Sequence, residues 1–315
     1  MTNELHIAPP QPDLASELEG VFVVSVIYNG LRWYRACIES ILAAGVPPER
    51  IILIENASPD GGGDRIAEDF PDVRLLRMDR NIGASAGANR GLRLALDRGA
   101  KYVLMLNIDV TIAPDMPLRL VETMRANPGY GILSPIQYNY SGEELDENFA
   151  KMHPPEEIAA ARNGLIDANT VIGAGVLAAR RVYETIGGMD ATYFVYGEED
   201  DFCRRARYHG IKVGVAVAAA MRHWHTAVNA ALSPRMRKLR FRNQFIYSLK
   251  DPAHSLPRHL YQYVRYYVWR RLAGAVERRE WRAAAAVLGV QFEMLWLLPR
   301  ILRIRHKERL GRWHL

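Results

Sequence analysis

Cysteine is scarce in this sequence, with only two among 315 residues. Cys37 and Cys203 lie far apart and lack the Cys-x-x-Cys spacing of thiolate metal sites. Two isolated cysteines also cannot form the dense framework of a small disulfide-stapled protein. The sequence therefore excludes a disulfide scaffold and a zinc ribbon, and it favours a reducing compartment.

Long apolar runs and targeting signals are also lacking. No uninterrupted stretch reaches the roughly 18 apolar residues that a membrane-spanning helix needs, so we expect no simple span. Residues 1–19 contain proline and acidic side chains but no basic stretch followed by an apolar core, which argues against a signal peptide. We expect this N-terminus to be flexible and the catalytic part to be cytoplasmic.

The phosphate-binding glycine motifs of two large enzyme classes are missing. The spacing from Gly83 to Gly87 does not fit a dinucleotide-binding fingerprint, and no glycine is followed by the Lys-Ser/Thr pair of a phosphate loop. The run from Gly61 to Gly63 fails the same tests. Hydride transfer and ATP hydrolysis by these folds are thereby disfavoured.

The composition is that of a globular protein with one substantial domain and an appendage. Hydrophobic residues make up 49% and charged residues 24%, and the net charge is +6. The basic excess lies mainly after Pro234. We expect a flexible segment over 1–19, a main domain over 20–232, and basic, aromatic-rich helices over 233–315.

Short apolar runs alternate with segments of helical periodicity in the first half of the chain. A parallel α/β sheet is the architecture that this alternation predicts, with ligands bound at the carboxyl ends of its strands. The expected strands are Val21–Ile27, Ile51–Ile54, Val73–Leu76, Tyr102–Leu106, Val171–Ala179 and Val213–Met221, and the expected helices are Leu31–Ala44 and Gly83–Asp97. After Pro114 we expect less regular structure, with a loop-rich insert over Tyr138–Pro155.

Asn107 and Asp109 directly follow an expected strand, where their side chains would enter the ligand crevice. Oxygen ligands at this place suit Mg²⁺ or Mn²⁺, which bind carboxylates and phosphate oxygens together. An ordinary turn capped by Asn and Asp would have the same residues.

Four consecutive carboxylates, Glu198 to Asp201, follow an aromatic segment and precede an expected helix. Carboxylates at a helix N-terminus are favoured by its dipole, which accounts for some of them. Partial burial raises a carboxyl pKa towards neutrality and suits it to remove a proton from a hydroxyl. We therefore choose Glu199 as the first candidate for a general base and Asp201 as the second.

His223 and His225 flank Trp224 at the end of an expected strand. Alternation along a strand would place both imidazoles on the same face, so either is a candidate third metal ligand. A structural, hydrogen-bonded histidine is the competing interpretation.

Taken in order, several motifs resemble those of the family 2 glycosyltransferases, especially the bacterial rhamnosyltransferase-like branch that builds envelope glycans. The resemblance spans about Val21 to His225. The motifs are Val26–Asn29, Ile54–Gly61, the Gly/Ala/Asn-rich segment Asn81–Gly91, Asn107–Asp109, Gly187–Asp190 and Tyr196–Phe202.

The resemblance implies a Rossmann-like A-type glycosyltransferase fold, an α/β domain with a mostly parallel central sheet, here followed by a C-terminal helical appendage. It implies one-step transfer of a sugar with inversion, from dTDP-rhamnose or a UDP-sugar to a cell-envelope glycan or lipid-linked acceptor. Asp109 with His223 or His225 would hold the divalent ion, and Glu199 would take the acceptor proton. The donor nucleotide would be bound or supported by Tyr28, Asn29, Glu55, Ser58, Asn81, Gly83, Asn89 and Asn107.

Three positions depart from the usual family pattern. Glu55 and Glu199 stand where the family generally has aspartate, and both changes keep the charge. Asn107 replaces an aspartate of many relatives, a variant that is common in the suspected branch.

The basic tail interleaves aromatic and aliphatic residues with arginine over Tyr261–Arg271 and Ala283–Arg305. This composition is typical of amphipathic helices on an anionic membrane face, so we expect a peripheral position on the inner face of the cell membrane. A helix pair covering the catalytic domain or a homodimer seam is the alternative. No recognised nucleic-acid-binding motif accompanies the charge.

Two other function classes compete with sugar transfer. A sugar-1-phosphate nucleotidyltransferase would show a Gly-rich, Arg/Lys-containing loop after its first strand, and the segment from Tyr28 to Trp33 is a poor version of one. A non-catalytic carbohydrate-binding protein on a degenerate transferase fold would tolerate loss of Asp109.

Overall fold

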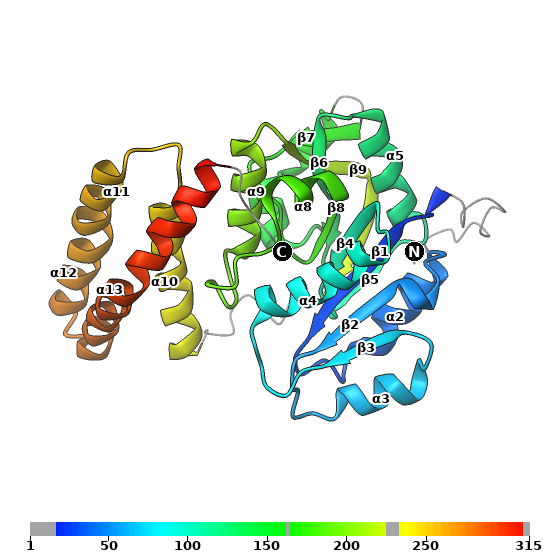
Figure 1. Cartoon of the computed structure of the whole chain (residues 1–315), viewed down its shortest axis with the longest axis horizontal. Coiled ribbons are helices and arrows are strands. Elements are labelled where there is room, and N and C mark those ends of the chain that lie inside the picture. Colours follow the sequence, from blue (N-terminus) through cyan, green and yellow to red (C-terminus); the bar gives the residue numbers. More distant parts are fainter. Residues whose placement is uncertain (1–16, 162–163, 225–232, 311–315) are drawn as a thin grey trace.

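The computed structural model describes residues 17–161, 164–224 and 233–310 (Figure 1). His225 and most of the expected flexible N-terminus therefore lie outside the described residues. Within them, nine strands form one mixed sheet in the order β3-β2-β1-β4-β8-β6-β9-β5, with β7 paired to β9. The strands are β1 Val21–Ile27, β2 Ile51–Glu55, β3 Arg74–Arg77, β4 Tyr102–Leu106, β5 Val110–Ile112, β6 Tyr130–Tyr138, β7 Leu165–Asp167, β8 Gly175–Ala179 and β9 Lys212–His223.

The first half of the sheet is parallel, as the alternating pattern predicts. β1 pairs with β2 on one side and β4 on the other, and β2 pairs with β3. The β1 and β2 runs are apolar and buried, since parallel strands covered on both faces bury every side chain. The polar residues that follow β1, β2 and β4 consequently meet along one edge of the sheet.

The second half of the sheet differs from the expected loop-rich region. After Pro114 the chain forms α5, Met116–Ala126, and then β6, which lies between β8 and β9 at the centre of this half. Gly131, Ser134 and Pro135 interrupt the apolar run of β6, and the register shifts between Pro135 and Ile136. The sequence-based expectation of irregular structure here is wrong, because the pairing partners and not the local pattern specify this strand.

A short helix, α6 Glu147–Met152, lies within the insert that we expected to be loop-rich, and a second, α7 Pro155–Ala159, begins where the insert ends. Phe149 of α6 is buried in a small core with Ile136, Ile166 and Val215. The segment therefore packs on the sheet beside β6, β7 and β9. The expected strand from Val171 also begins later, at Gly175, and residues 171–174 form a connection with a turn at 173–174.

The remaining helices of the sheet region cover its faces and ends. α4 packs on β1 and β2, and α5 packs on β6 and β9. Gly87 and Gly91 of α4 lie so close to Val24 and Val26 that an added Cβ would come within 2.5–2.9 Å of them. The helices are α2 Tyr34–Ala43, α3 Gly62–Asp69, α4 Ala84–Asp97, α8 Arg180–Ile186 and α9 Glu198–Tyr208, with a 3₁₀ turn at Pro48–Arg50.

The C-terminal helices form a second body beside α9 with its own apolar core (Figure 1). Its buried side chains include Phe245, Ile246, Val290 and Ile301. The elements are α10 Pro234–Lys250, α11 Leu256–Gln262, a π-helical segment Tyr263–Trp269, α12 Arg270–Glu277 and α13 Trp281–Arg309.

The helix α13 is long and apolar enough, by length and composition, to cross a membrane. The expectation of no simple span rests on uninterrupted apolar runs. The apolar sequence of α13 is instead interrupted by polar residues such as Gln291 and Glu293. Only 22% of its most apolar window is buried within the protein. The core helix of a soluble protein can have the same length and composition.

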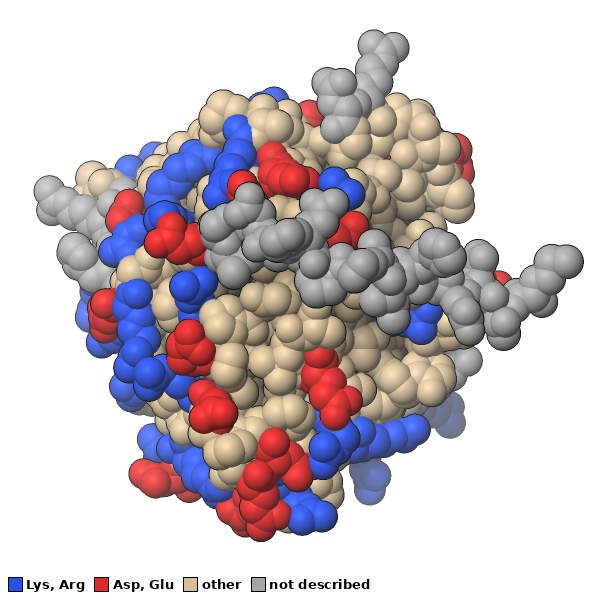
Figure 2. All heavy atoms as spheres, turned by 90° about the vertical axis from the view of Figure 1, so that its right-hand side faces the viewer, with Lys and Arg blue, Asp and Glu red and all other residues tan. Residues whose placement is uncertain are grey.

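The face of the sheet domain turned away from the C-terminal helices carries both charge signs (Figure 2). Lysine and arginine side chains gather along its margin, and aspartate and glutamate lie among them. On the described part of this face, no broad field of a single sign is visible (Figure 2).

Candidate active site

Asp109 and His223 come together as the sequence predicts for a metal site. β5 pairs antiparallel with the end of β9, which places His223 opposite Val110. The Nε2 atom of His223 lies 3.6 Å from Oδ1 of Asp109, and the main-chain N–H of Trp224 donates to the Asp109 carbonyl over 2.8 Å. A carboxylate and a buried imidazole at this separation fit the donor set of a divalent ion.

Asn107 precedes this pair, and its backbone is fixed while its side chain is exposed. Its N–H donates to the carbonyl of Ala174 over 2.9 Å, and its carbonyl accepts from the thiol of Cys37 at 3.7 Å. The backbone bonds leave the amide side chain at the sheet edge, available to a ligand.

The residues after β1 and β2 form one bonded loop pair, at the place expected for the base and ribose pocket. Asn29 adopts a left-handed backbone conformation, with φ of 58°, and its N–H donates to Oγ of Ser58 over 3.1 Å. The N–H of Ser58 donates to Oε1 of Glu55 over 2.6 Å. Tyr28 is 49% exposed beside them. The longer Glu55 side chain therefore caps its own loop, which fixes its carboxylate beside Ser58.

Two residues that sequence reasoning did not select hold this region in shape. Asp60 accepts from the N–H groups of Leu31 and Gly62 over 2.9 and 3.0 Å, which links the loops after β1 and β2. Asn56 is buried, and its Oδ1 accepts from the N–H of Ile82 over 2.9 Å. Both residues lie within motifs that resemble the family, and nothing else in the sequence points to their role.

Asn81, Gly83 and Asn89 bond to the protein itself. Oδ1 of Asn81 accepts from the N–H of Gly83 over 2.9 Å, and the Asn89 amide makes two bonds to the main chain of Met189, at 2.7 and 2.8 Å. A Cβ on Gly83 would lie 2.6 Å from the ring of Phe194. Among the described contacts these residues fasten loops together, and their predicted contact with a nucleotide stays a prediction.

Glu199 lies in the first turn of α9 against Gly173. An added Cβ on Gly173 would lie 3.3 Å from the carboxyl carbon and Oε1 of Glu199, so glycine leaves the space that this carboxyl occupies. Burial raises the pKa of Glu199 to about 8, and the charges of Glu198 and Asp200 add to the effect. Burial likewise raises the pKa of Glu198 to about 7. A carboxyl with such a pKa can accept a proton near neutral pH.

A short run of contacts joins this carboxyl to the metal-site candidates. A Cβ built on Gly173 would lie 3.3 Å from Oε1 of Glu199, and the next residue, Ala174, accepts the hydrogen bond from Asn107. Asp109 follows two residues after Asn107. Glu199 and Asn107 therefore lie beside adjacent residues of one connection.

Asp201, the second base candidate, is fully buried in an ion-pair network. Its carboxylate accepts from Arg204, Arg205 and Lys250 at 2.8–2.9 Å. Burial opposes ionisation, but these three cations outweigh it and hold the pKa of Asp201 well below its usual range. A carboxylate that stays ionised with its oxygens engaged is suited to hold structure together.

An aromatic cluster borders the Asp109 site. The ring of Trp224 lies 4.6 Å from Trp33 and 3.5 Å from Tyr140 between centroids, and the guanidinium of Arg32 lies 4.4 Å from the Trp33 ring centroid. The backbone bond from Trp224 to Asp109 attaches this cluster to the metal-ligand candidates.

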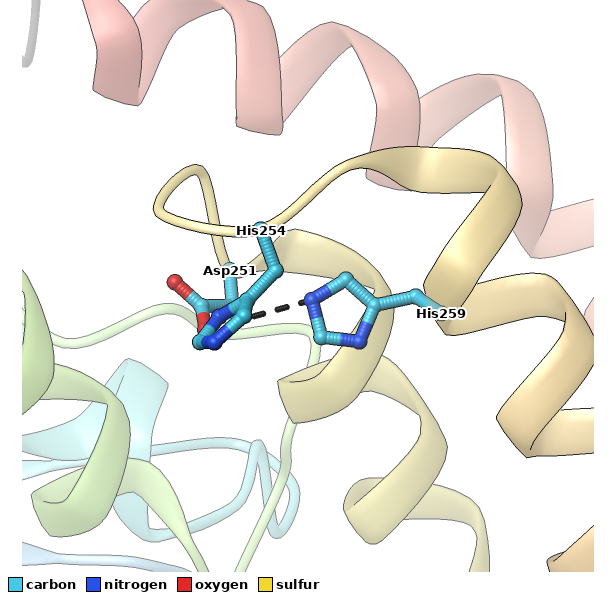
Figure 3. A group of neighbouring side chains, drawn as sticks. All are labelled: Asp251, His254 and His259. Atoms are coloured by element: carbon cyan, nitrogen blue, oxygen red, sulfur yellow. Dashed lines mark hydrogen bonds and ion pairs between the residues drawn. The ribbon is translucent and has the colours of Figure 1, made fainter.

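A second group with metal-binding residue types lies where α10 ends, away from this site (Figure 3). Asp251 accepts from Nδ1 of His254 over 2.8 Å, and Nε2 of His259 lies 3.9 Å from the same oxygen. The other carboxylate oxygen accepts from the N–H of Ala253 over 3.0 Å. Arg305 donates to the carbonyls of Asp251 and His254. Hydrogen bonds and a neighbouring cation account for this group as a helix-end cap.

Comparisons with known proteins agree on the fold. A mannosyltransferase from Pyrobaculum calidifontis, solved with GDP-Man and Mn²⁺, superimposes with a TM-score of 0.56 at 17% identity, covering 93% of this chain and 85% of that one. S. aureus TarS residues 1–349, solved with UDP-GlcNAc, give 0.57 at 13% identity, covering 93% and 88%. The predicted A-type glycosyltransferase fold is confirmed, with a mixed sheet rich in parallel pairs.

Curated relatives carry transferase names. A low-salt glycan biosynthesis hexosyltransferase of Haloferax volcanii is 27% identical over 206 residues, covering 62% of this chain and 66% of that protein, just under two thirds of its length. The N-acetylglucosaminyl-diphospho-decaprenol L-rhamnosyltransferase of Mycobacterium tuberculosis is 25% identical, covering 64% and 75%. The dTDP-rhamnosyl transferase RfbF of Shigella flexneri is 23% identical, covering 64% and 71%.

The family model described as glycosyl transferase family 2 matches residues 22–187, which is more than half of the chain. That range contains β1 to β8 with the expected nucleotide pocket, Asn107 and Asp109. By this match, the chain belongs to glycosyl transferase family 2.

Proposed function

We propose that this glycosyltransferase moves a sugar, with inversion, from a nucleotide-diphosphate donor to a hydroxyl of a cell-envelope glycan or lipid-linked acceptor. The observation that carries the proposal is the position of Glu199 beside Gly173, whose neighbour Ala174 binds the Asn107 backbone. In this proposal the proton acceptor and the phosphate-side site face one crevice. Family membership favours sugar transfer over the nucleotidyltransferase alternative.

The chain's own residues have three tasks in this reaction. The loops of Asn29, Glu55 and Ser58 bind the nucleoside, and Asn107 faces the diphosphate. Glu199 removes the proton from the acceptor hydroxyl as its oxygen bonds to the anomeric carbon. The bond from that carbon to the diphosphate oxygen breaks on the opposite face, so the configuration inverts.

Asp109 and His223 are the residues that would hold Mg²⁺ or Mn²⁺. When bound, the ion neutralises the charge that develops on the leaving diphosphate. His225 stays an alternative ligand that lies outside the described residues. The mannosyltransferase with GDP-Man and Mn²⁺ supports this assignment by its fold.

The donor sugar is proposed as rhamnose from dTDP-rhamnose, with UDP-sugars as the second choice. Two of the relatives are named rhamnosyltransferases, whereas the haloarchaeal one is named a hexosyltransferase. A thermal-shift screen of nucleotide sugars with Mg²⁺ and Mn²⁺ separates these choices, because a ligand that binds only the folded state raises the unfolding temperature.

The decisive experiment compares wild type with Asp109→Ala in product formation. We expect metal-dependent turnover in wild type, its loss in Asp109→Ala, and a product whose anomeric configuration by NMR is opposite to the donor's. Full wild-type activity in excess chelator would remove the metal from the mechanism. Wild-type turnover retained in Asp109→Ala would remove Asp109 from the mechanism, and absence of turnover in wild type would favour the non-catalytic alternative.

The C-terminal helices are proposed to lie on an anionic membrane surface. Leu288, Phe292, Leu295 and Trp296 form a helical stripe on α13 in which each side chain is more than half exposed. Exposed arginines follow at 300 and 303, and such a pairing favours the interface of an anionic bilayer. Trp296→Glu should reduce co-flotation with anionic vesicles, whereas Tyr208→Glu on α9 should not. Concentration-dependent dimerisation lost in Trp296→Glu would assign the stripe to a second copy instead.

A further inference from the structure

The loop that leads into the acidic turn of α9 has an unusual backbone. Phe194, Tyr196 and Gly197 adopt left-handed conformations, with φ of 67°, 71° and 87°. For residues with a side chain this conformation costs free energy and persists where surrounding contacts impose it. Glu199 lies two residues beyond the last of these positions, so the loop sets where its carboxyl points.

Two consecutive side chains of α10 hold this loop. The amide nitrogen of the buried Asn243 lies 2.9, 2.7 and 2.7 Å from the carbonyls of Tyr193, Val195 and Tyr196. The guanidinium of Arg242 donates to the carbonyls of Thr192 and Tyr193 over 2.8 and 3.0 Å. Every carbonyl from 192 to 196 except that of Phe194 therefore receives a bond from α10.

The Phe194 carbonyl faces the opposite way, towards the donor side of the site. It accepts from the N–H of Ala84, at the start of α4, over 2.6 Å. The loop is thus fastened on one side by the Gly/Ala/Asn-rich segment and on the other by α10. Arg242 also donates to Oδ1 of Asn243, which turns the amide nitrogen towards the loop, and pairs with Glu293 of α13 over 3.0 Å.

We infer that Asn243 and Arg242 are positioning residues for the general base, so that the C-terminal helices form part of the active site. The inference rests on the proposed function and adds to it the group that fixes Glu199. The attachment of α10 to the sheet domain does not depend on these two side chains alone, because Lys250, two turns further along the helix, pairs with Asp190 and Asp201. Positioning and general stability can therefore be separated by mutation.

The test uses the full chain with Asn243→Ala and Asn243→Asp, and with Gln244→Ala as the matched control. Gln244 is the next residue of α10, is exposed, and bonds to Arg271. We expect both Asn243 variants to lower kcat by about tenfold to a hundredfold, because a small displacement of a catalytic group has effects of that size. The donor Kd should stay within about twofold, since the variants leave the phosphate-side contacts intact.

Two further readouts distinguish positioning from a purely structural role. The acid limb of the pH–kcat profile should move to lower pH in Asn243→Ala, because a displaced Glu199 is better hydrated and its pKa falls. Hydrogen exchange of the amides from 193 to 201 should accelerate in the Asn243 variants and stay unchanged in Gln244→Ala. The hydrogen-exchange measurement needs no acceptor substrate.

The outcomes are separable. Unchanged exchange over residues 193–201, or equal kcat and pH profile for Asn243→Ala and Gln244→Ala, would overturn the inference while leaving sugar transfer in place. Wild-type protein that binds no nucleotide sugar and transfers none would overturn the proposed function. In that case accelerated exchange in the Asn243 variants would still assign the loop contact to Asn243.

Discussion

The two faces of the first turn of α9 contain carboxylates of nearly identical chemistry in opposite surroundings. On the face towards Gly173, Glu199 lies close to the carboxylates of Glu198 and Asp200, and burial and their charges raise its pKa. On the face towards the C-terminal helices, Asp201 meets three cations, and its pKa is lowered. The proposed proton acceptor and this buried, ion-paired carboxylate are only two positions apart in the sequence.

This contrast shows that neighbours decide the role of a carboxyl group. Both groups are removed from water, which by itself would raise both pKa values. Only Asp201 receives compensating charge, and part of that charge comes from Lys250, 49 residues further along the chain. Carboxyls whose environments push their pKa values apart are a mark of catalytic sites.

The largest effect should come from neutralising the two carboxyls separately. Glu199→Gln should lower kcat by about 10²–10⁴-fold, the usual contribution of a general base, while donor binding is kept. Asp201→Asn should instead lower the unfolding temperature, with an unchanged pH profile in the folded enzyme. Steady-state kinetics and calorimetry on both variants measure this. An unaffected rate in Glu199→Gln would move the base role to Glu198 or another group.

A large loss of stability should follow from removing the cation on the structural face. Lys250 is fully buried and lies 2.7, 2.8 and 3.3 Å from Asp190, Asp201 and Glu308. Lys250→Met leaves buried anions uncompensated, which costs about 3–5 kcal/mol in the free energy of unfolding. Urea denaturation measures this loss of unfolding free energy. As the control, Lys238→Met at the exposed pair with Glu293 should cost below about 1 kcal/mol. Equal losses of unfolding free energy in the two variants would contradict the difference between the buried and the exposed cation.

The smallest effect should be a pH-dependent gain of stability in Glu199→Gln. The pKa of Glu199 is raised in the folded state, so its stabilising contribution is complete below the ordinary glutamate pKa and is lost as pH rises towards about 8. The variant should therefore unfold at a higher temperature than wild type near pH 8, and the difference should shrink near pH 4.5. Thermal scans across this range check the sign. A difference that grows towards acid would contradict the raised pKa.

Much of the parallel half of the fold could be predicted from the sequence. Strands β1 and β4 have the expected bounds, because uninterrupted β-branched and apolar runs with turn residues on both sides leave little alternative. β6 could not be predicted, since Gly131 and Pro135 break its pattern and its pairing with β8 and β9 supplies the order. Local pattern fails where tertiary contacts decide.

For the candidate site, the sequence predicted which residues belong to it better than it predicted what those residues contact. The approach of His223 to Asp109 followed from their strand-end positions. Asp201 could not be separated from Glu199, because its cations come from an i+4 arginine and from a helix far along the chain. Asn89 was expected at the nucleotide, but its partner is the main chain of Met189, 100 residues away. The order of the motifs identifies such residues, but it does not predict their contacts.

The carboxylate of Glu308 is among the last charged groups of the buried ion-pair network to be synthesised. It stands near the end of α13 and bonds to Arg204 over 2.8 Å, beside Lys250. During translation Asp201 and Arg204 leave the ribosome about a hundred residues before this anion. The charge balance beneath the acidic turn is therefore completed only when α13 docks, which ties maturation of the enzyme to the arrival of its most apolar helix.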